Sequence, residues 1–217
     1  MSKQERNGQR KSRAQLSRHR SPELGYYIIV TDTKETEQNY MYGLRDSIPK
    51  ELQGRLVIKV KETKTCNLIE EALTQASLYP QYGEIWIVFD RDQVQNFDSI
   101  INDALLKGIH VGWTNPCIEE WFCAYFGKMS PYADSVKCCS GFSKQFEDKV
   151  GHPYVKSDKD IYKKLIQYGD EEKAIAIAKG KAQEHESNGN KKPSQQCPGT
   201  TMHLLVEEIK SKIQKGT

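Results

Sequence analysis

The chain has 217 residues, enough for one compact domain with a buried core, and its formal net charge is +3. No apolar run approaches the roughly 20 residues that a membrane-spanning helix requires, and the N-terminal segment lacks the apolar centre of a secretion signal. These features argue against a helical membrane protein and against a secreted protein. They predict a cytoplasmic protein with a single core.

Charge is distributed unevenly, because residues 1–22 form a basic arm. Seven basic residues against one acid give this arm a net charge of +6, which leaves −3 for residues 23–217. Large apolar residues are nearly absent, so the arm cannot bury enough surface to offset its ordering entropy, and we expect it to be disordered in isolation. It can bind nucleic-acid phosphates or be a solvated tail, and charge alone does not separate these alternatives. The candidate nucleic-acid contacts are Arg10, Lys11, Arg13, Arg18, Arg20, Lys34 and Arg91.

Strand-like and helix-like segments alternate four times after the arm. Apolar, β-branched runs predict buried strands at 26–31, 56–60, 84–89 and 109–113. Helical spacing predicts a helix after Thr36 as N-cap, helices at 66–77 and 97–107, and a fourth with Asn115 as cap and Pro116 in its first turn. This alternation is typical of an α/β protein with an open, mostly parallel sheet and helices on both faces.

Helical patterns dominate the C-terminal part of the chain. We expect helices at 140–150, 158–168, 171–183 and 202–214. The segment at about 184–199 is polar and rich in Gly, Pro, Asn and Ser, which predicts a flexible loop. The expected organisation is therefore a basic arm (1–22) and one domain (23–217), with an α/β core at about 26–130 and a helical part at 131–217.

The six cysteines show no C-x-x-C pair, and no histidine is close enough in the sequence to complete a zinc knuckle. Reduced structural thiols are the expected state. The five histidines are scattered, so the sequence does not favour a histidine-rich metal site.

Acidic residues follow three of the four predicted strands. In an open parallel sheet, the loops at the carboxyl ends of the strands line the functional crevice, so these acids are expected to converge. Two acids two residues apart in an extended segment face the same way. The residues are Asp32, Glu35 and Glu37 after the first strand, Asp90 and Asp92 after the third, and Glu119 after the fourth.

Helical geometry separates Glu119 from its neighbour Glu120. Apolar residues from Ile118 to Phe126 recur at the spacing of one helix face, and at about 100° per residue Glu119 falls at the edge of that face. A carboxylate there is expected to be paired or coordinated, because leaving it in apolar surroundings is costly. Glu120 falls on the opposite side and is expected to be a solvated surface acid.

Clustered carboxylates without His or Cys neighbours suit a hard divalent cation such as Mg²⁺ or Mn²⁺. Such an ion can activate water for attack on a phosphodiester. Each single acid also has a simpler interpretation, since acids often cap helices or make turns. The metal hypothesis therefore depends on three clusters converging at one end of one sheet.

Three motifs resemble the RloB-like family, a Toprim-type group associated with bacterial abortive phage infection: IIV-x-D-x-x-x-TE-x-x-Y, VFDRDQ and TNPC-x-E-x-W. The resemblance runs over most of the chain from Tyr26 onward, and PGTTMHLLVEEI resembles the family's C-terminal ending. It implies a Toprim-like sheet and a Mg²⁺-dependent nuclease that works with an ATPase partner. The matching positions are Thr36, Glu37, Tyr40, Asp90, Asp92, Asn115, Pro116, Cys117, Glu119 and Trp121.

The chain departs from the family pattern at three positions. Asp32 stands where the pattern has glutamate at the strand end, Thr33 replaces the following glycine, and Tyr125 stands where a histidine is expected. Aspartate keeps the charge but is one methylene shorter, and threonine lacks glycine's easy access to positive φ.

Three functional hypotheses remain open. The first is a Mg²⁺- or Mn²⁺-dependent nuclease for RNA or DNA, in which Asp90, Asp92 and Asp32 hold metal and Asp32, Glu37 and Glu119 support catalysis. The second is a degenerate Toprim-type domain that binds nucleic acid or a partner ATPase without cleaving, which Asp32 and Thr33 favour. The third is a phosphotransfer or ligand-sensing site like that of response-regulator receivers. The sequence leaves a homo-oligomeric state open.

Overall fold

The structure is a computed structural model that describes residues 22–32, 35–78, 83–92 and 94–217. Most of the predicted nucleic-acid contacts lie outside the described residues, and so does Thr33. These contacts are Arg10, Lys11, Arg13, Arg18, Arg20 and Lys34. Within the described ranges, no helix has the length and apolar character needed to cross a membrane.

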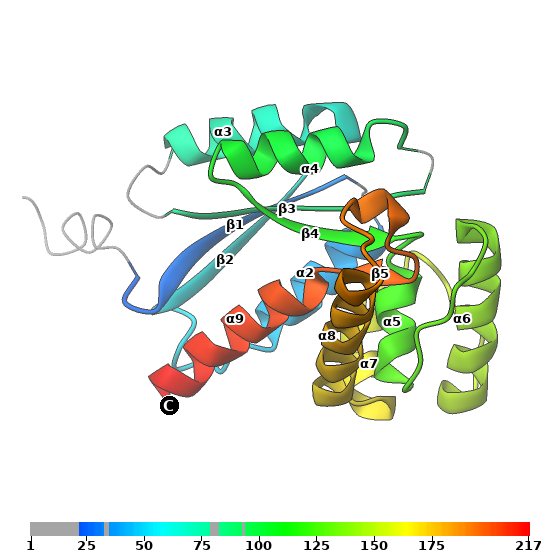
Figure 1. The fold of residues 1–217 in the computed structure, drawn as a ribbon. Helices are drawn as coiled ribbons and strands as arrows, with labels where there is room; N and C mark the ends of the chain where they lie inside the picture. The colour runs from blue at the N-terminus through cyan, green and yellow to red at the C-terminus, as the bar shows by residue number, and fades with distance from the viewer. Residues whose placement is uncertain (1–21, 33–34, 79–82, 93) are drawn as a thin grey trace, which may run out of the picture.

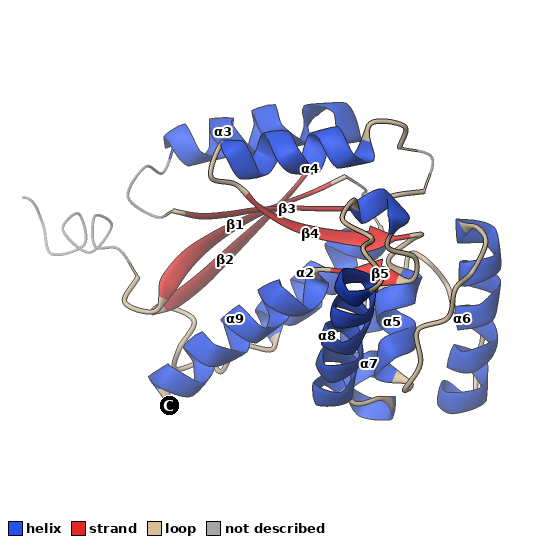
Figure 2. Ribbon diagram, in the orientation of Figure 1, coloured by secondary structure: helices blue, strands red, loops and turns tan. Residues whose placement is uncertain are grey.

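A five-stranded sheet with the order β2-β1-β3-β4-β5 forms the centre of the molecule (Figures 1 and 2). The strands β1 (Gly25–Thr31), β2 (Leu56–Glu62), β3 (Glu84–Asp90) and β4 (His110–Asn115) are parallel, and β5 (Gly199–Thr200) runs antiparallel to β4. The predicted α/β fold with an open, mostly parallel sheet is confirmed, and it is consistent with a Toprim-like fold.

Strand β1 lies in the interior of the sheet, between β2 and β3. Ile29 pairs with Val60 on one side and with Trp86 on the other. Residues 27–31 are fully buried, because both edges of the strand are paired and both faces are covered by helices. This position explains the continuous apolar run, which is typical of a strand buried on both faces.

Two helical layers cover the sheet (Figure 2). Helices α3 (Leu68–Leu78) and α4 (Phe97–Leu106) pack on one face, against side chains such as Ile28 and Phe89. The other face, with Ile29 and Val88, is covered by α2 (Thr36–Asp46) and α9 (Met202–Gly216). The remaining helices extend this second layer beside β4 and β5: α5 (Glu119–Tyr125), α6 (Ser135–Val150), α7 (Ile161–Tyr168) and α8 (Glu171–Ser187).

Both helix caps predicted near the site were wrong. Thr36 is the first residue of α2, and its hydroxyl donates to the Lys156 carbonyl over 3.2 Å instead of capping the helix. Asn115 is the last residue of β4, and α5 begins only at Glu119. The Asn115 amide donates to the carbonyls of Pro193 and Ser194, so it holds a distant segment rather than a helix start.

The segment 184–199, predicted as a loop, contains ordered secondary structure. It includes the end of α8 at Ser187, a 3₁₀ turn at Pro193–Gln195, and Gly199 of β5. The two-residue strand β5 has no periodicity of its own. It forms because Gly199 pairs with Asn115 and Thr200 with Thr114 at the edge of the sheet.

Candidate metal centre at the strand ends

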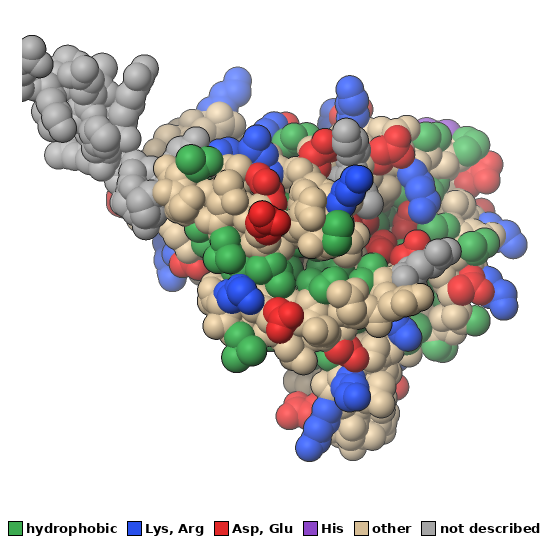
Figure 3. Space-filling view, turned by 90° about the horizontal axis from the view of Figure 1, so that it is seen from above, with side chains coloured by type: hydrophobic (Ala, Val, Ile, Leu, Met, Phe, Trp, Pro, Cys, Tyr) green, Lys and Arg blue, Asp and Glu red, His purple; other side chains and the backbone are tan. Residues whose placement is uncertain are grey.

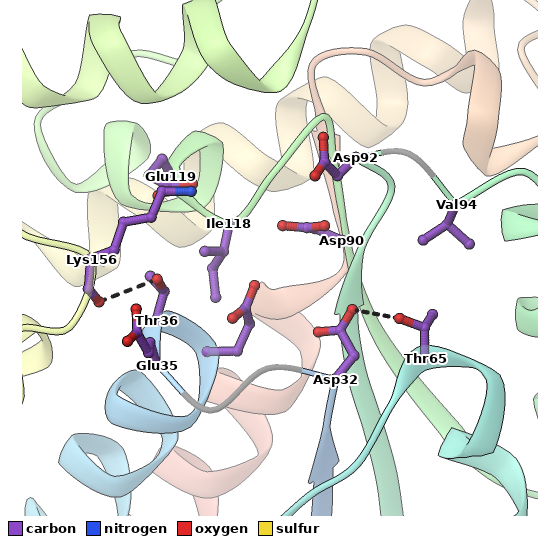
Figure 4. A pocket seen from close by; sticks show the side chains of 11 residues that line it. Asp32, Glu35, Thr36, Thr65, Asp90, Asp92, Val94, Ile118, Glu119 and Lys156 are labelled. Carbon is purple, nitrogen blue, oxygen red and sulfur yellow. Dashed lines mark hydrogen bonds and ion pairs between the residues drawn. The ribbon is translucent and has the colours of Figure 1, made fainter.

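A cavity of about 570 Å³ lies at the carboxyl ends of β1 and β3, and acidic side chains dominate its lining (Figure 4). Figure 3 shows acidic side chains set back in a recess of the face viewed there. The structure thus brings together the site residues predicted from the first, third and fourth strands. The lining acids are Asp32, Glu35, Glu37, Asp90, Asp92 and Glu119, and the other lining residues are Thr36, Thr65, Val94, Ile118 and Lys156.

The parallel sheet places Asp32 and Asp90 next to each other. Asp32 follows β1 directly, and its backbone N–H donates to the Val88 carbonyl of β3 over 3.3 Å. Asp90 is the last residue of β3. Glu37 comes from the first turn of α2 and is buried. In Figure 4, the carboxylates of Asp32 and Asp90 point into the cavity.

One oxygen of Asp32 has no hydrogen-bond partner among the described residues. Its Oδ2 accepts a bond of 3.3 Å from the Thr65 hydroxyl, whereas Oδ1 is buried and unpartnered. Burial, and then the negative charge of Glu37, raises the pKa of Asp32 to about 7. Such a buried carboxylate oxygen requires a proton, a cation or water.

Asp90 is in the same electrostatic situation. Burial first, and then the charges of Glu37, Asp32 and Glu119, raise its pKa well above the ordinary value of an aspartate. Lys156 is the one basic side chain among the described residues of the lining, against six acids. The cavity is therefore strongly negative, and a divalent cation would relieve the repulsion between its carboxylates.

Asp92 lines the cavity near Asp90 (Figure 4), but its side chain lies at the exposed rim. It is exposed and accepts a hydrogen bond from the Ser135 hydroxyl. Strand β3 ends at Asp90, so the extended geometry that would turn both carboxylates the same way does not continue to Asp92. The Asp92 backbone N–H instead donates to the Pro116 carbonyl.

Glu119 is almost completely buried and paired, as expected for an acid at the edge of an apolar helix face. Its Oε1 accepts a bond of 3.1 Å from the Tyr154 hydroxyl and lies 3.6 Å from the Lys156 ammonium nitrogen. Both partners come from the segment between α6 and α7.

The prediction that Glu120 is a solvated surface acid was wrong, because its side chain is fully buried. Its Oε1 accepts from the Ser130 backbone N–H over 2.6 Å, and the Cys138 thiol donates to Oε2 over 3.3 Å. Burial is the largest cause that raises its pKa to about 7. Helices α6 and α8 pack against α5, so the side of α5 opposite the sheet is also interior.

Sequence reasoning missed several residues that shape the cavity. Lys156 and Tyr154 come from a segment that carries no motif, and Ser135 begins α6. Thr65 comes from the 3₁₀ turn before α3. No sequence signal distinguishes Lys156 from the chain's other lysines, and only the packing of its segment against Thr36 places it here.

The chemistry of the cavity suits a hard cation. Mg²⁺ is usually held by one or two carboxylates and keeps several waters, and the unpartnered oxygen of Asp32 beside Asp90 offers such a site. Asp32, Asp90 and Asp92 do not bring three ligand oxygens within 4.8 Å of one another. In this geometry, the three predicted ligands therefore cannot all contact one cation directly.

One group of potential metal ligands among the described residues does meet that spacing. It consists of Cys117, Glu119 and Cys139. The two sulfur atoms are 3.9 Å apart, and all six cysteines are free. The Lys156 ammonium interacts with both Glu119 and Cys139. A positive charge already occupies this position, so a soft metal ion is disfavoured there.

Two other predicted positions lie outside the cavity. Arg91 lines a neighbouring hollow of about 510 Å³ together with Asp92 and Ser194. Tyr125, which stands where the family pattern has histidine, is 1% exposed, and its hydroxyl hydrogen-bonds with Tyr40 and donates to Glu171. This departure from the pattern belongs to a buried network and not to the acidic site.

Comparison with protein families gives a match over most of the chain. The model of a protein family described as RloB-like protein matches residues 27–209. No curated protein and no solved structure matches the chain.

Proposed function

This chain belongs to the RloB-like family, and from that membership and its acidic cavity we propose that it is a Mg²⁺- or Mn²⁺-dependent nuclease that hydrolyses phosphodiester bonds of RNA or DNA. The observation that carries the proposal is the pair formed by Asp32 and Asp90 at adjacent strand ends. Both carboxyls have raised pKa values, and a buried oxygen of Asp32 has no hydrogen-bond partner in the described part of the chain. This pair fits a cation and a proton-transfer group in one place.

Asp90 and Asp32 are the residues that would hold the cation, with Asp92 acting through water. When bound, Mg²⁺ would polarise the phosphate and lower the pKa of a water molecule. Glu37 and Glu119 supply the surrounding negative charge that keeps the cation in the cavity. Clustered carboxylates of this kind are the ligands that hard cations prefer.

Asp32 is suited to move the proton. Its pKa is about 7 without a cation, and a bound cation would lower it, so Asp32 would be ionised and able to accept a proton from water. In the proposed step, the water oxygen bonds to phosphorus, the water proton passes to the Asp32 carboxylate, and the bond from phosphorus to the leaving oxygen breaks. The leaving oxygen then takes a proton from solvent.

Lys156 is the residue we assign to the substrate phosphate. Its side chain is 58% exposed at the mouth of the cavity, and its nitrogen is 3.6 Å from Glu119, so it can turn toward an incoming anion. A phosphate would otherwise meet only carboxylates, which repel it.

The biological setting in this proposal rests on the family resemblance alone. We propose that cleavage occurs in the cytoplasm, serves bacterial anti-phage defence and is licensed by an ATPase partner. Copurification of an ATPase with the tagged chain, and loss of phage protection in an Asp90→Asn strain, would support it.

The nuclease proposal is tested with Asp90→Asn, which keeps the size of the side chain and removes its charge. Mixed single- and double-stranded RNA and DNA are incubated with Mg²⁺ or Mn²⁺, and Asp103→Asn, an exposed acid on α4, is the control. We expect cleavage by the wild type and the control and none by Asp90→Asn. Mn²⁺ should also raise the melting temperature of the wild type more than that of Asp90→Asn. Equal cleavage by all three proteins contradicts the proposal.

A second candidate is a domain that binds nucleic acid or its partner without cleaving. It is favoured by the rim position of Asp92 and the absence of three closely spaced ligand oxygens from Asp32, Asp90 and Asp92. Restoring the family residue with Asp32→Glu separates the two candidates. Gain of cleavage indicates a weakened catalytic centre, and an inactive wild type that stays inactive in Asp32→Glu favours the binding role.

A further inference from the structure

A second hollow, larger than the acidic cavity, lies between α2 and α7. Its volume is about 920 Å³, and apolar surface from side chains such as Tyr42 and Ile166 forms much of its wall. We call this hollow the α2–α7 groove. None of the acids assigned above to the metal site lines it.

The α2–α7 groove and the acidic cavity share both of their walls. On α2, Thr36 and Glu37 line the cavity, and Gln38 and Tyr42 line the groove. Gln38 and Tyr42 are four residues apart, so they lie on one face of α2, just beyond the first turn that borders the cavity. On the opposite side, Lys156 lines the cavity, and Lys159 and Lys163 follow it along the groove. The two hollows therefore open beside the same helix and the same chain segment, next to the contact between Thr36 and Lys156.

Of the two aromatic side chains that line the groove, Tyr42 is held in a fixed orientation by its neighbours. The Gln38 amide donates to the Tyr42 hydroxyl over 3.2 Å, and the Arg45 guanidinium carbon lies 4.7 Å from the centre of the Tyr42 ring. Tyr42 is half-buried, so part of its surface is still open to a ligand. A ring that is already positioned loses little conformational entropy when a planar group stacks on it.

The base of the groove depends on close helix packing. A Cβ atom added to Gly43 would lie 2.4 Å from the Cβ of Tyr162, so α2 and α7 can touch at this point only because residue 43 is glycine. The Tyr162 hydroxyl donates to Glu171, whose other oxygen lies 2.9 Å from the Lys210 nitrogen. The negative charge of Glu171, at the base of the groove, is therefore balanced by Lys210.

Among the described residues that line it, the groove has more unpaired basic side chains than unpaired acidic side chains. Lys159 and Lys163 are exposed and make no ion pair with any described residue. Arg45 forms an ion pair with Asp46 at 2.7 Å. The remaining charges in the groove are then one acid, Asp160, and the two lysines. The adjoining cavity has six acids and one lysine among its described lining residues. A polyanion that enters the cavity thus needs contacts outside it, and the groove supplies them.

We propose that the α2–α7 groove binds one or more nucleotides of a single-stranded RNA or DNA next to the phosphodiester held in the acidic cavity. A base stacks on Tyr42, and Lys159 and Lys163 contact the flanking phosphates. Base stacking on aromatic side chains beside a basic track is the general mode of single-strand binding. This inference rests on the proposed function in one respect, namely that a phosphodiester occupies the acidic cavity.

The groove favours a nucleic acid over a peptide for two reasons. The carboxylates of the cavity would attract a basic peptide, but Lys159 and Lys163 of the groove would repel it, whereas a nucleic acid places its phosphates against these lysines. The ring of Tyr42 beside Arg45, with exposed lysines further along, matches an alternation of bases and phosphates.

Binding is measured by fluorescence anisotropy of a labelled single strand of about 12 nucleotides with EDTA present, so that no cleavage occurs. Two variants remove the proposed contacts, Tyr42→Ala and the double variant Lys159→Ala with Lys163→Ala. The controls are Tyr42→Phe, which keeps the ring, and Lys107→Ala, an exposed lysine at the end of α4. We expect Kd to rise about tenfold or more in the first two proteins and to change less than about twofold in the controls. Equal melting temperatures establish that each variant is folded.

A second readout reports stacking directly. A strand that carries 2-aminopurine should lose fluorescence on binding to the wild type and to Tyr42→Phe, but not on binding to Tyr42→Ala. Tyr42→Ala that binds and quenches like the wild type overturns the proposal, and so does a wild type that binds only duplex or no nucleic acid. Loss of affinity in Lys107→Ala as large as in the double lysine variant also overturns it. If the wild type binds as expected but never cleaves with Mg²⁺ or Mn²⁺, the nuclease proposal fails and the groove assignment stands.

Discussion

The Thr36 hydroxyl donates a hydrogen bond of 3.2 Å to the Lys156 carbonyl, which ties the start of α2 to the segment between α6 and α7 (Figure 4). The two residues are 120 positions apart in the chain. The contact holds Lys156 at the mouth of the acidic cavity, where its side chain pairs with Glu119. Thr36 therefore positions the Lys156 side chain rather than capping α2.

Replacing Thr36 with valine should loosen this contact. Valine keeps the shape of the side chain but cannot donate, so one hydrogen bond is lost and the free energy of unfolding should fall by about 1 kcal/mol. We also expect weaker substrate binding, seen as a higher KM with kcat little changed. Thr36→Ser keeps the hydroxyl and should behave like the wild type, and a normal KM in Thr36→Val would show that the contact does not position Lys156.

Asp32 should make stability depend on pH. Its pKa in the folded protein is about 7, above the ordinary value of about 4, so the folded state binds this proton more tightly than the unfolded state. The resulting stability is fully present below about pH 4 and is lost as the pH rises through about 7. Urea denaturation at several pH values should show a smaller fall in Asp32→Asn than in the wild type. Asp103→Asn should keep the wild-type slope, and an unchanged slope in Asp32→Asn would contradict the raised pKa.

Glu120 should behave as a buried structural acid. Glu120→Ala removes the acceptor for the Ser130 N–H and the Cys138 thiol, so we expect a loss of about 2 kcal/mol in the free energy of unfolding. Glu120→Gln keeps an acceptor and removes the charge. Because the pKa of Glu120 is about 7, the glutamine variant should gain stability relative to the wild type as the pH rises from about 6 to about 8. Equal pH dependence of the two proteins in urea denaturation would refute this.

Restoring the family's histidine at position 125 should not improve activity. Tyr125 hydrogen-bonds with Tyr40 at 2.8 Å and donates to Glu171 at 2.9 Å, in a fully buried position away from the cavity. Tyr125→Phe leaves Tyr40 and Glu171 with one partner fewer and should cost about 2 kcal/mol, and Tyr125→His should cost at least as much. Thermal melting and the nuclease assay are compared at equal folded fraction. Higher cleavage in Tyr125→His would show that the position acts in catalysis.

Gly43 is required by the packing of α2 on α7. The Cβ of Gly43→Ala would lie 2.4 Å from the Tyr162 Cβ, which cannot rotate away, so the helices must separate at a cost of about 1–3 kcal/mol. Gly54→Ala is the matched control, because an added Cβ there meets no atom within 4 Å. We expect the melting temperature to fall in Gly43→Ala and to stay level or rise in Gly54→Ala.

Local patterns in the sequence are sufficient to predict the α/β core. The apolar runs near Ile29 and Val88 and the helical spacing around Ile101 depend only on neighbouring residues, so their strands and helices can be placed within a few residues. The rule that parallel strands end at one edge of a sheet then predicts that Asp32 and Asp90 lie together.

Contacts between distant segments cannot be predicted in this way. Periodicity assigns Glu120 to the solvent side of its helix, because it describes one helix and not the α6 and α8 helices that cover that side. Lys156 reaches the cavity through a bond to Thr36, and β5 exists only because the edge of β4 is available. These features depend on which surfaces meet after folding.

The sequence by itself therefore determined the order of elements, the sheet and the acids at its strand ends, because each follows from the spacing of nearby residues. Only the tertiary structure decided which acids are buried, that Asp92 lies at the exposed rim, and that Lys156 stands at the mouth of the cavity. The physical reason is that charge and burial depend on all neighbours in space. Asp32 shows both levels, since its position follows from β1, while its pKa depends on Glu37 and on the packing around it.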